Sequence, residues 1–254
     1  MEKIDIIKSI SERTGGDIYL GVVGAVRTGK STFIKKFIEN LVVPNIEDEY
    51  ERKRCLDEIP QTAQGKTIMT IEPKFVPSTA AKIKVEEFET NIKLVDCVGY
   101  VIPAAKGYED EMGEPRMVKT PWYDEDIPFV EAAEIGTEKV IRDHSTIGIV
   151  VTTDGSIGDI TRNNYIEAEN EVISELKEIG KPFIVLLNSA HPTLPETERL
   201  AEKLKEEHNV PVIPISAETM NEKDVYNILK EALYEFPVLN VKVDIPDWIG
   251  TLNP

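Results

Sequence analysis

The run Gly24-Ala-Val-Arg-Thr-Gly29-Lys30-Ser31 fits the phosphate-loop pattern Gly-x-x-x-x-Gly-Lys-Ser without a gap or mismatch. An apolar run, residues 18–23, precedes it, and apolar residues at helical spacing follow it (Phe33, Ile34, Phe37, Ile38 and Leu41). These flanks predict the strand, loop and helix that the motif requires. The glycines let backbone N–H groups surround an anion, and the helix N-terminus adds a partial positive charge. The sequence therefore predicts a nucleoside triphosphate site.

The positions of this loop have different expected roles. Lys30 is expected to place its ammonium on the β- and γ-phosphates, and Ser31 to give its hydroxyl to Mg²⁺. A glycine-rich turn without a ligand would not require a lysine and a serine there. The nucleotide-binding residues expected in the loop and the first helical turn are Gly24, Ala25, Val26, Arg27, Thr28, Gly29, Lys30, Ser31 and Thr32.

A second phosphate-contacting motif, Asp96-Cys-Val-Gly99, ends a later apolar strand. In this Asp-x-x-Gly pattern, Asp96 is expected to hold Mg²⁺ through water and the Gly99 amide to contact the γ-phosphate. Residues 65–72 lie between the two motifs, where Ras-type GTPases carry a switch threonine. Thr70 is the first choice for that residue and Thr67 the second. The expected metal-binding set is Ser31, Thr70 and Asp96.

The base-reading motif departs from that of GTPases. After a strand at 183–187, the chain reads Asn188-Ser-Ala-His191 where those GTPases carry Asn-Lys-x-Asp. Their aspartate accepts hydrogen bonds from guanine, and adenine offers no such pair of donors. Ser216 and Ala217 still resemble the next motif, whose backbone lines the base. The sequence therefore predicts ATP, with Asn188, Ser216 and Ala217 near the base.

Two further departures concern the reaction. Tyr100 stands where Ras-type enzymes carry the glutamine that orients the attacking water. The water must then be positioned by the Thr70 backbone, by a residue such as Gln61 or Gln64, or by a neighbouring subunit. Arg27 replaces an asparagine that coordinates potassium in some relatives, and it is a candidate catalytic charge. An exposed arginine in a surface ion pair is an equal alternative.

Composition narrows the possible partners. The formal net charge of the chain is −17, and no basic run is visible, which disfavours unaided binding to nucleic acid or to anionic lipid. No apolar run approaches the roughly 20 residues that span a bilayer. We therefore expect no nucleic-acid partner and no direct membrane insertion.

Strand and helix patterns alternate along the chain, most regularly over 147–235. This alternation predicts an α/β fold, a P-loop NTPase with a three-layer, mostly parallel sheet and the topology of Ras-like and translation-factor GTPases. Residues 44–70 are expected to form a long, partly ordered connection, and residues 102–130 a second irregular stretch. The second is a candidate nucleotide-responsive lid or assembly surface, or simply a solvated loop. We expect residues 1–237 to form the P-loop domain and 238–254 to begin a following, truncated domain.

Several runs outside the general motifs resemble one family. They include residues 11–31, 65–70, 72–77, 94–100, 106–110 and 234–238, and they are similar to stage IV sporulation protein A, a family of spore coat morphogenetic ATPases. The resemblance covers the whole chain. It carries the family's loop lysine to Lys30, its Mg²⁺-site aspartate to Asp96 and its switch threonine to Thr70. Ile71 stands where the family can show a second threonine.

The resemblance implies a function beyond nucleotide binding. It implies a cytoplasmic ATPase of the mother cell whose ATP hydrolysis drives self-assembly into a static homopolymer, the basement layer of the spore coat. A small amphipathic membrane-anchoring protein would recruit this layer to the forespore outer membrane, together with other spore coat morphogenetic proteins. A regulatory GTPase and a nucleotide-binding scaffold with little turnover remain the alternatives.

Overall fold

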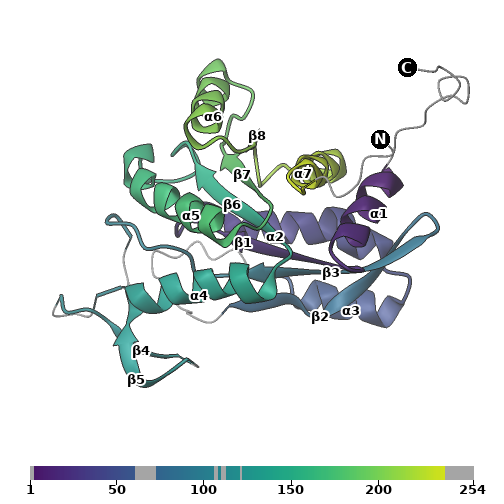
Figure 1. Cartoon of the computed structure of the whole chain (residues 1–254), viewed down its shortest axis with the longest axis horizontal. Coiled ribbons are helices and arrows are strands. Elements are labelled where there is room, and N and C mark those ends of the chain that lie inside the picture. Colours follow the sequence, from purple (N-terminus) through teal and green to yellow (C-terminus); the bar gives the residue numbers. More distant parts are fainter. Residues whose placement is uncertain (1–2, 61–72, 106–107, 110–112, 121, 238–254) are drawn as a thin grey trace, which may run out of the picture.

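The computed structural model describes residues 3–60, 73–105, 108–109, 113–120 and 122–237. Its centre is a six-stranded sheet in the order β2-β3-β1-β6-β7-β8 (Figure 1). The parallel strands are β1 (Asp17–Val23), β3 (Phe88–Asp96), β6 (Ile147–Thr153), β7 (Phe183–Asn188) and β8 (Val212–Ile215). At one edge, β2 (Lys74–Val85) pairs antiparallel with β3. The predicted α/β fold with a mostly parallel sheet is confirmed.

The central strands are buried on both faces. Every residue of β6 and of β7 is buried. Such strands have nearly continuous apolar sequences, because a parallel sheet needs helices on both sides to connect its strands. The carboxyl ends of these strands lie at one edge of the sheet, where ligands bind in open α/β folds.

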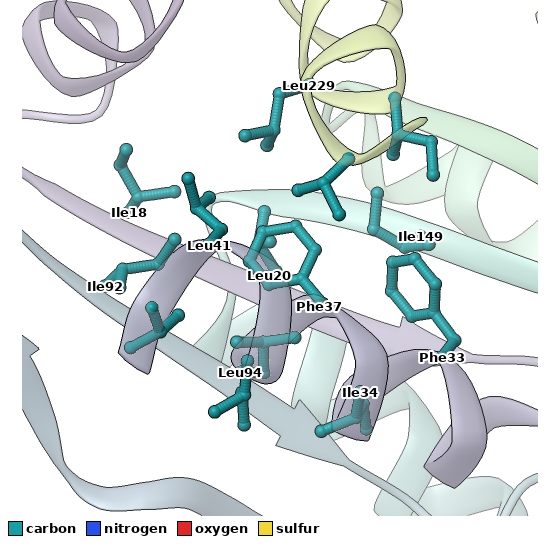
Figure 2. Packing of buried hydrophobic residues seen from close by; sticks show 14 of the residues in the cluster. Ile18, Leu20, Phe33, Ile34, Phe37, Leu41, Ile92, Leu94, Ile149 and Leu229 are labelled. Atoms are coloured by element: carbon teal, nitrogen blue, oxygen red, sulfur yellow. The ribbon is translucent and has the colours of Figure 1, made fainter. Parts of the chain in front are cut away.

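Two layers of helices cover the sheet (Figure 1). On one face lie α1 (Lys3–Arg13), α2 (Lys30–Phe37) and α7 (Glu222–Tyr234), and on the other lie α4 (Phe129–His144) and α5 (Ile166–Ile179). A further helix, α6 (Pro195–His208), packs through Ala201 and Leu204 onto Leu187 of β7. Figure 2 shows Phe33 and Phe37 of α2 in the hydrophobic core between the sheet and the layer formed by α1, α2 and α7. Their ring centroids lie 5.8 Å apart. This packing fixes the start of α2 beneath the phosphate loop.

The prediction of a partly ordered connection over 44–70 missed a helix in its described part. Residues Glu49–Asp57 form α3, after a π-helical turn (Ile38–Val42) and a 3-10 turn (Val43–Asn45) that extend α2. The side chain of Asp48 caps α3 by accepting a hydrogen bond from the Glu51 N–H at 2.7 Å. Because Cys55 is the only residue of α3 that is buried, the apolar period that identifies helices is nearly absent there.

The irregular stretch predicted over 102–130 is also wrong in part. Residues Met117–Thr120 (β4) and Tyr123–Pro128 (β5) form an antiparallel hairpin, which projects away from the main sheet (Figure 1). Val118 packs with Phe129 and Ala132 of α4 and fixes the base of the hairpin. Met117 and Tyr123 are exposed. The hairpin is thus anchored at one end and presents apolar side chains to solvent.

Candidate functional site

The phosphate loop connects the end of β1 to the start of α2, and the two glycines of its motif have backbone angles that favour glycine. Gly24 has φ 136° and Gly29 has φ 93°. A Cβ atom at Gly24 would lie 2.2 Å from the Val151 carbonyl oxygen, and one at Gly29 would lie 2.2 Å from the Asn188 Nδ2. These approaches hold the loop against the carboxyl ends of β6 and β7. Thr32 lies half-buried in the first turn of α2.

Lys30 lies inside this loop, and its side chain is 6% exposed. Its ammonium donates hydrogen bonds to the carbonyl oxygens of Gly24 at 3.2 Å and Ala25 at 2.7 Å. Burial lowers the pKa of Lys30, and the nearby Cys97 and Asp96 oppose that shift. A buried ammonium that donates these hydrogen bonds to neutral carbonyls is a favourable site for an anion.

Ser31 and Asp96 meet beside this ammonium. The Ser31 hydroxyl donates to the Asp96 Oδ2 at 2.9 Å, whereas the Asp96 Oδ1 is buried and has no hydrogen-bond partner among the described residues. Burial raises the pKa of Asp96, and the charge of Lys30 and the hydrogen bond from Ser31 oppose that shift. An unpartnered buried carboxylate oxygen indicates a missing ligand of positive charge or a missing donor.

The hydroxyl and carboxylate of this pair suit Mg²⁺, which binds through one or two protein oxygens together with phosphates and waters. Among the described residues, no group of three or more His, Cys, Asp or Glu side chains gathers to hold a metal by itself. The donors therefore fit a cation that arrives with a nucleotide better than one held by the protein alone.

The Asp-x-x-Gly loop lies directly on the phosphate loop. Gly99 has φ 87°, and a Cβ atom there would lie 2.1 Å from the Gly24 carbonyl oxygen and 2.5 Å from the Lys30 Nζ. The Val26 N–H donates to the Tyr100 carbonyl oxygen at 2.8 Å, and the Tyr100 N–H donates to that of Gly24 at 3.2 Å. The two motifs predicted from sequence are thus brought together.

Tyr100, at the position of the usual glutamine, does not face solvent. Its side chain is 1% exposed, and its hydroxyl donates a hydrogen bond to the carboxylate of Glu175 on α5. Burial and this carboxylate raise the pKa of Tyr100. The side chain is therefore held by α5 and is not available to orient a water molecule.

Asn188 joins the phosphate loop to the expected base-binding loop. Its Nδ2 donates to the Thr28 carbonyl oxygen at 2.9 Å, and its Oδ1 accepts from the Ala217 N–H at 3.0 Å. Ser216 lies half-buried beside Ala217. These predicted residues therefore meet at the same edge of the sheet as Lys30.

A family model described as the stage IV sporulation protein A ATPase domain matches residues 1–237. The chain belongs to the stage IV sporulation protein A family. The chain is 65% identical over 254 residues to stage IV sporulation protein A of Bacillus anthracis, and 64% identical over the same length to that of Bacillus subtilis (strain 168). These alignments cover 100% of this chain and 51% of each relative.

A third relative is more distant. Stage IV sporulation protein A of Clostridioides difficile (strain 630) is 51% identical over 250 residues, which cover 98% of this chain and 51% of the relative. The chain thus spans about half the length of the curated relatives that it matches. Together with the phosphate loop, the family assigns the chain to sporulation and indicates a nucleotide-binding ATPase domain.

The remaining predicted site residues of this stage IV sporulation protein A domain are four that the structure does not describe and Arg27, which it does. Thr70, Thr67, Gln61 and Gln64 lie outside the described residues. Arg27 is exposed and has φ 64°, a left-handed conformation that is uncommon for a residue with a side chain. Its charge acts on Tyr165 at the start of α5, where it opposes the rise that burial causes in the tyrosine's pKa.

Sequence reasoning missed the loop between β6 and α5. Arg162 holds this loop by donating to both carboxylate oxygens of the buried Glu169. Asp154 and Ser156 lie at its start and face the turn that contains Ser189. The signal was Asp154-Gly-Ser156, a turn sequence directly after a buried strand. Within the described residues, no helix has the length and apolar character to cross a membrane.

Proposed function

We propose that this chain binds ATP with Mg²⁺ and hydrolyses it, and that this nucleotide cycle drives self-assembly into the basement layer of the spore coat. The observation that carries the enzymatic part is the Asp96 Oδ1, which has no partner within the described part of the chain and lies beside the Ser31 hydroxyl and the buried Lys30 ammonium. A structural glycine-rich turn would not leave a carboxylate oxygen buried without a partner. A nucleotide bound with its metal satisfies all three groups at once.

The chain's own groups divide the work of binding. Lys30 exchanges the Gly24 and Ala25 carbonyls for oxygens of the β- and γ-phosphates. Ser31 would hold Mg²⁺ through its hydroxyl and Asp96 through water, with Thr70 as the proposed third contributor. Bound Mg²⁺ would neutralise charge that develops on the phosphates. The Gly99 N–H contacts the γ-phosphate, so the Asp-x-x-Gly loop responds to the presence of that group.

ATP is preferred over GTP in this proposal because the guanine-reading carboxylate is replaced by His191 and the lysine that packs over the base by Ser189. Hydrolysis proceeds without the usual glutamine, since Tyr100 stands at that position and its hydroxyl is hydrogen-bonded to Glu175. Arg27 supplies positive charge at the phosphate loop. The attacking water is positioned by the Thr70 backbone, by Gln61 or Gln64, or by a neighbouring subunit.

The proposed partners are other copies of the chain, a small amphipathic membrane-anchoring protein and other spore coat morphogenetic proteins. The place of action is the mother-cell cytoplasm, at the surface of the forespore outer membrane. A net charge of −17 supports recruitment by an adaptor, since anionic lipid and nucleic acid repel such a chain. Met117 and Tyr123 of the hairpin are exposed and form a candidate assembly surface.

Phosphate release over a series of protein concentrations tests the proposal, with ATP and GTP compared and Lys30→Ala as the inactive control. We expect ATP turnover to rise more than linearly with protein concentration, because assembly completes the site. A flat absence of turnover with retained ATP binding would indicate an inert scaffold. A preference for GTP would indicate a regulatory GTPase.

A further inference from the structure

The turn after β7 holds His191 in a defined place while leaving its side chain exposed. The His191 N–H donates to the Ser189 Oγ at 2.9 Å. Its carbonyl oxygen accepts from the Thr197 hydroxyl at 3.2 Å and from the Leu194 N–H at 3.1 Å. Both backbone polar groups of His191 are therefore fixed, and only the imidazole remains to contact something outside the turn.

A hydrogen-bond network behind the turn, part buried and part exposed, provides this restraint. Ser189 is 0% exposed, and its Oγ lies 3.3 Å from the Ser156 Oγ. The Ser156 hydroxyl donates to the Asp154 Oδ1 at 2.6 Å and accepts from the Ala190 N–H at 2.9 Å. Thr197 also reaches the Asp154 Oδ2 at 3.3 Å. Although burial opposes it, these hydrogen bonds lower the pKa of Asp154 and keep it an acceptor.

The turn also lies next to the phosphate loop. Asn188, three residues before His191, donates to the Thr28 carbonyl oxygen at 2.9 Å and accepts from Ala217 at 3.0 Å. Asn188 pairs with Ile215 across β7 and β8. A nucleotide with its phosphates at Lys30 therefore extends its base toward the surface formed by residues 188–191 and 216–217.

Hydrogen-bond chemistry then distinguishes the two purines. An aspartate at the position of His191 offers two acceptors, which match the N1–H and exocyclic amine donors of guanine. Adenine instead presents one amine donor next to a ring-nitrogen acceptor. A neutral imidazole has one donor and one acceptor and can offer one of them at a time to adenine, whereas the amide of glutamine or asparagine offers both when it pairs with adenine in nucleic-acid recognition.

We propose that His191 reads the adenine base, and that Ser189, Ser156, Thr197 and Asp154 position it. This inference rests on the proposed function, because it requires the nucleotide to be an adenine nucleotide. It adds a positive selector for adenine to the loss of the guanine selector. It also accounts for the exchange of a lysine for Ser189, whose hydroxyl accepts the His191 N–H.

The test is a binding series at residue 191 with ADP and GDP, which avoids hydrolysis. The variants are His191→Gln, His191→Ala and His191→Asp. Because the His191 side chain is exposed, their melting temperatures should equal that of wild type, and measuring them checks the fold. We expect His191→Gln to keep the preference for ADP, and His191→Ala to lower ADP affinity about tenfold with little change for GDP. His191→Asp should reverse the preference. Ser189→Ala should lower the preference partly, as a positioning residue would.

Two failures are distinguishable. If His191→Ala retains the wild-type ratio of ADP to GDP affinity, or loses affinity for both equally, the reading role is wrong and the proposed ATPase stands. If the wild-type chain shows no preference for ADP, the choice of ATP in the proposed function is itself wrong.

Discussion

The hydroxyl of Tyr100 donates a hydrogen bond to the carboxylate of Glu175, and this contact ties the Asp-x-x-Gly loop to α5. Tyr100, which replaces a catalytic glutamine, thus holds the Asp-x-x-Gly loop against α5. Burial raises the pKa of Glu175, the hydrogen bond from Tyr100 lowers it, and the nearby carboxylates of Glu171 and Glu138 raise it further. Burial likewise raises the pKa of Glu134 on α4. Burial and neighbouring carboxylates therefore disfavour the charged form of these carboxyl groups at the interface between α4 and α5.

Glu175→Gln should stabilise the protein at pH 7 to 8. A carboxyl group with a raised folded-state pKa contributes stability that is fully present below its ordinary value of 4.5 and lost as pH rises through the raised pKa. Glutamine resembles the protonated form and still accepts from Tyr100. The difference in melting temperature from wild type should shrink as pH falls toward about 4.5. Glu202→Gln on α6 is the control for net charge, and an equal effect there would reject the explanation.

Tyr100→Phe should destabilise the protein without a selective loss of catalysis. The variant keeps the buried ring but removes the donor, so the Glu175 carboxylate loses a partner. We expect a loss of about 1 kcal/mol in the free energy of unfolding. ATP turnover at saturating ATP, measured well below the melting temperature, should stay within about twofold of wild type, because the loss is structural. A large fall in turnover with unchanged stability would show that the hydroxyl takes part in the reaction.

The sheet could be predicted from the sequence because its buried strands and amphipathic helices alternate with distinct periods. Helix α3 and the β4–β5 hairpin could not, since neither has a clear apolar period. Asp48 followed by Glu51 was a usable helix-start signal for α3. In β5, Asp124, Glu125 and Asp126 are all exposed, so the strand has no buried face to produce alternation.

The local parts of the site could be predicted for a different reason. The phosphate loop and Asp-x-x-Gly motif are short runs whose chemistry and backbone geometry lie in consecutive residues. The bond between Tyr100 and Glu175 joins positions 75 residues apart, and the contact of Ser156 with Ser189 spans 33. Such pairs depend on how α5 and the β6–α5 loop pack, and no local pattern encodes that.

Gly99→Ala should be far more damaging than Gly180→Ala, although both glycines have positive φ. The Cβ atom of the first would lie 2.1 Å from the Gly24 carbonyl oxygen, whereas nothing lies within 4 Å of the second, which caps α5. Gly180→Ala should therefore cost only the backbone penalty, about 1 kcal/mol. Gly99→Ala should also weaken ATP binding, because the Asp-x-x-Gly loop must move off the phosphate loop. Denaturant unfolding and ATP titration of both variants measure this, and equal effects on affinity would contradict it.

Arg27→Gly separates the backbone of the phosphate loop from the charge it carries. At φ 64°, arginine is strained and glycine is not, so the substitution should raise the free energy of unfolding by up to about 1 kcal/mol. If the guanidinium stabilises charge in the reaction, turnover should fall at least about tenfold while ATP affinity changes little.

Arg27→Ala is the matched control, since it removes the charge but keeps a strained residue at the same position. It should lose turnover as much as Arg27→Gly and gain no stability. Unfolding and single-turnover phosphate release on both variants decide between the two roles of Arg27. Full turnover in Arg27→Gly would show that Arg27 is a surface charge with no role in the reaction. Greater stability together with lost turnover in Arg27→Gly would mean that the strained backbone conformation of Arg27 places a charge that the reaction requires.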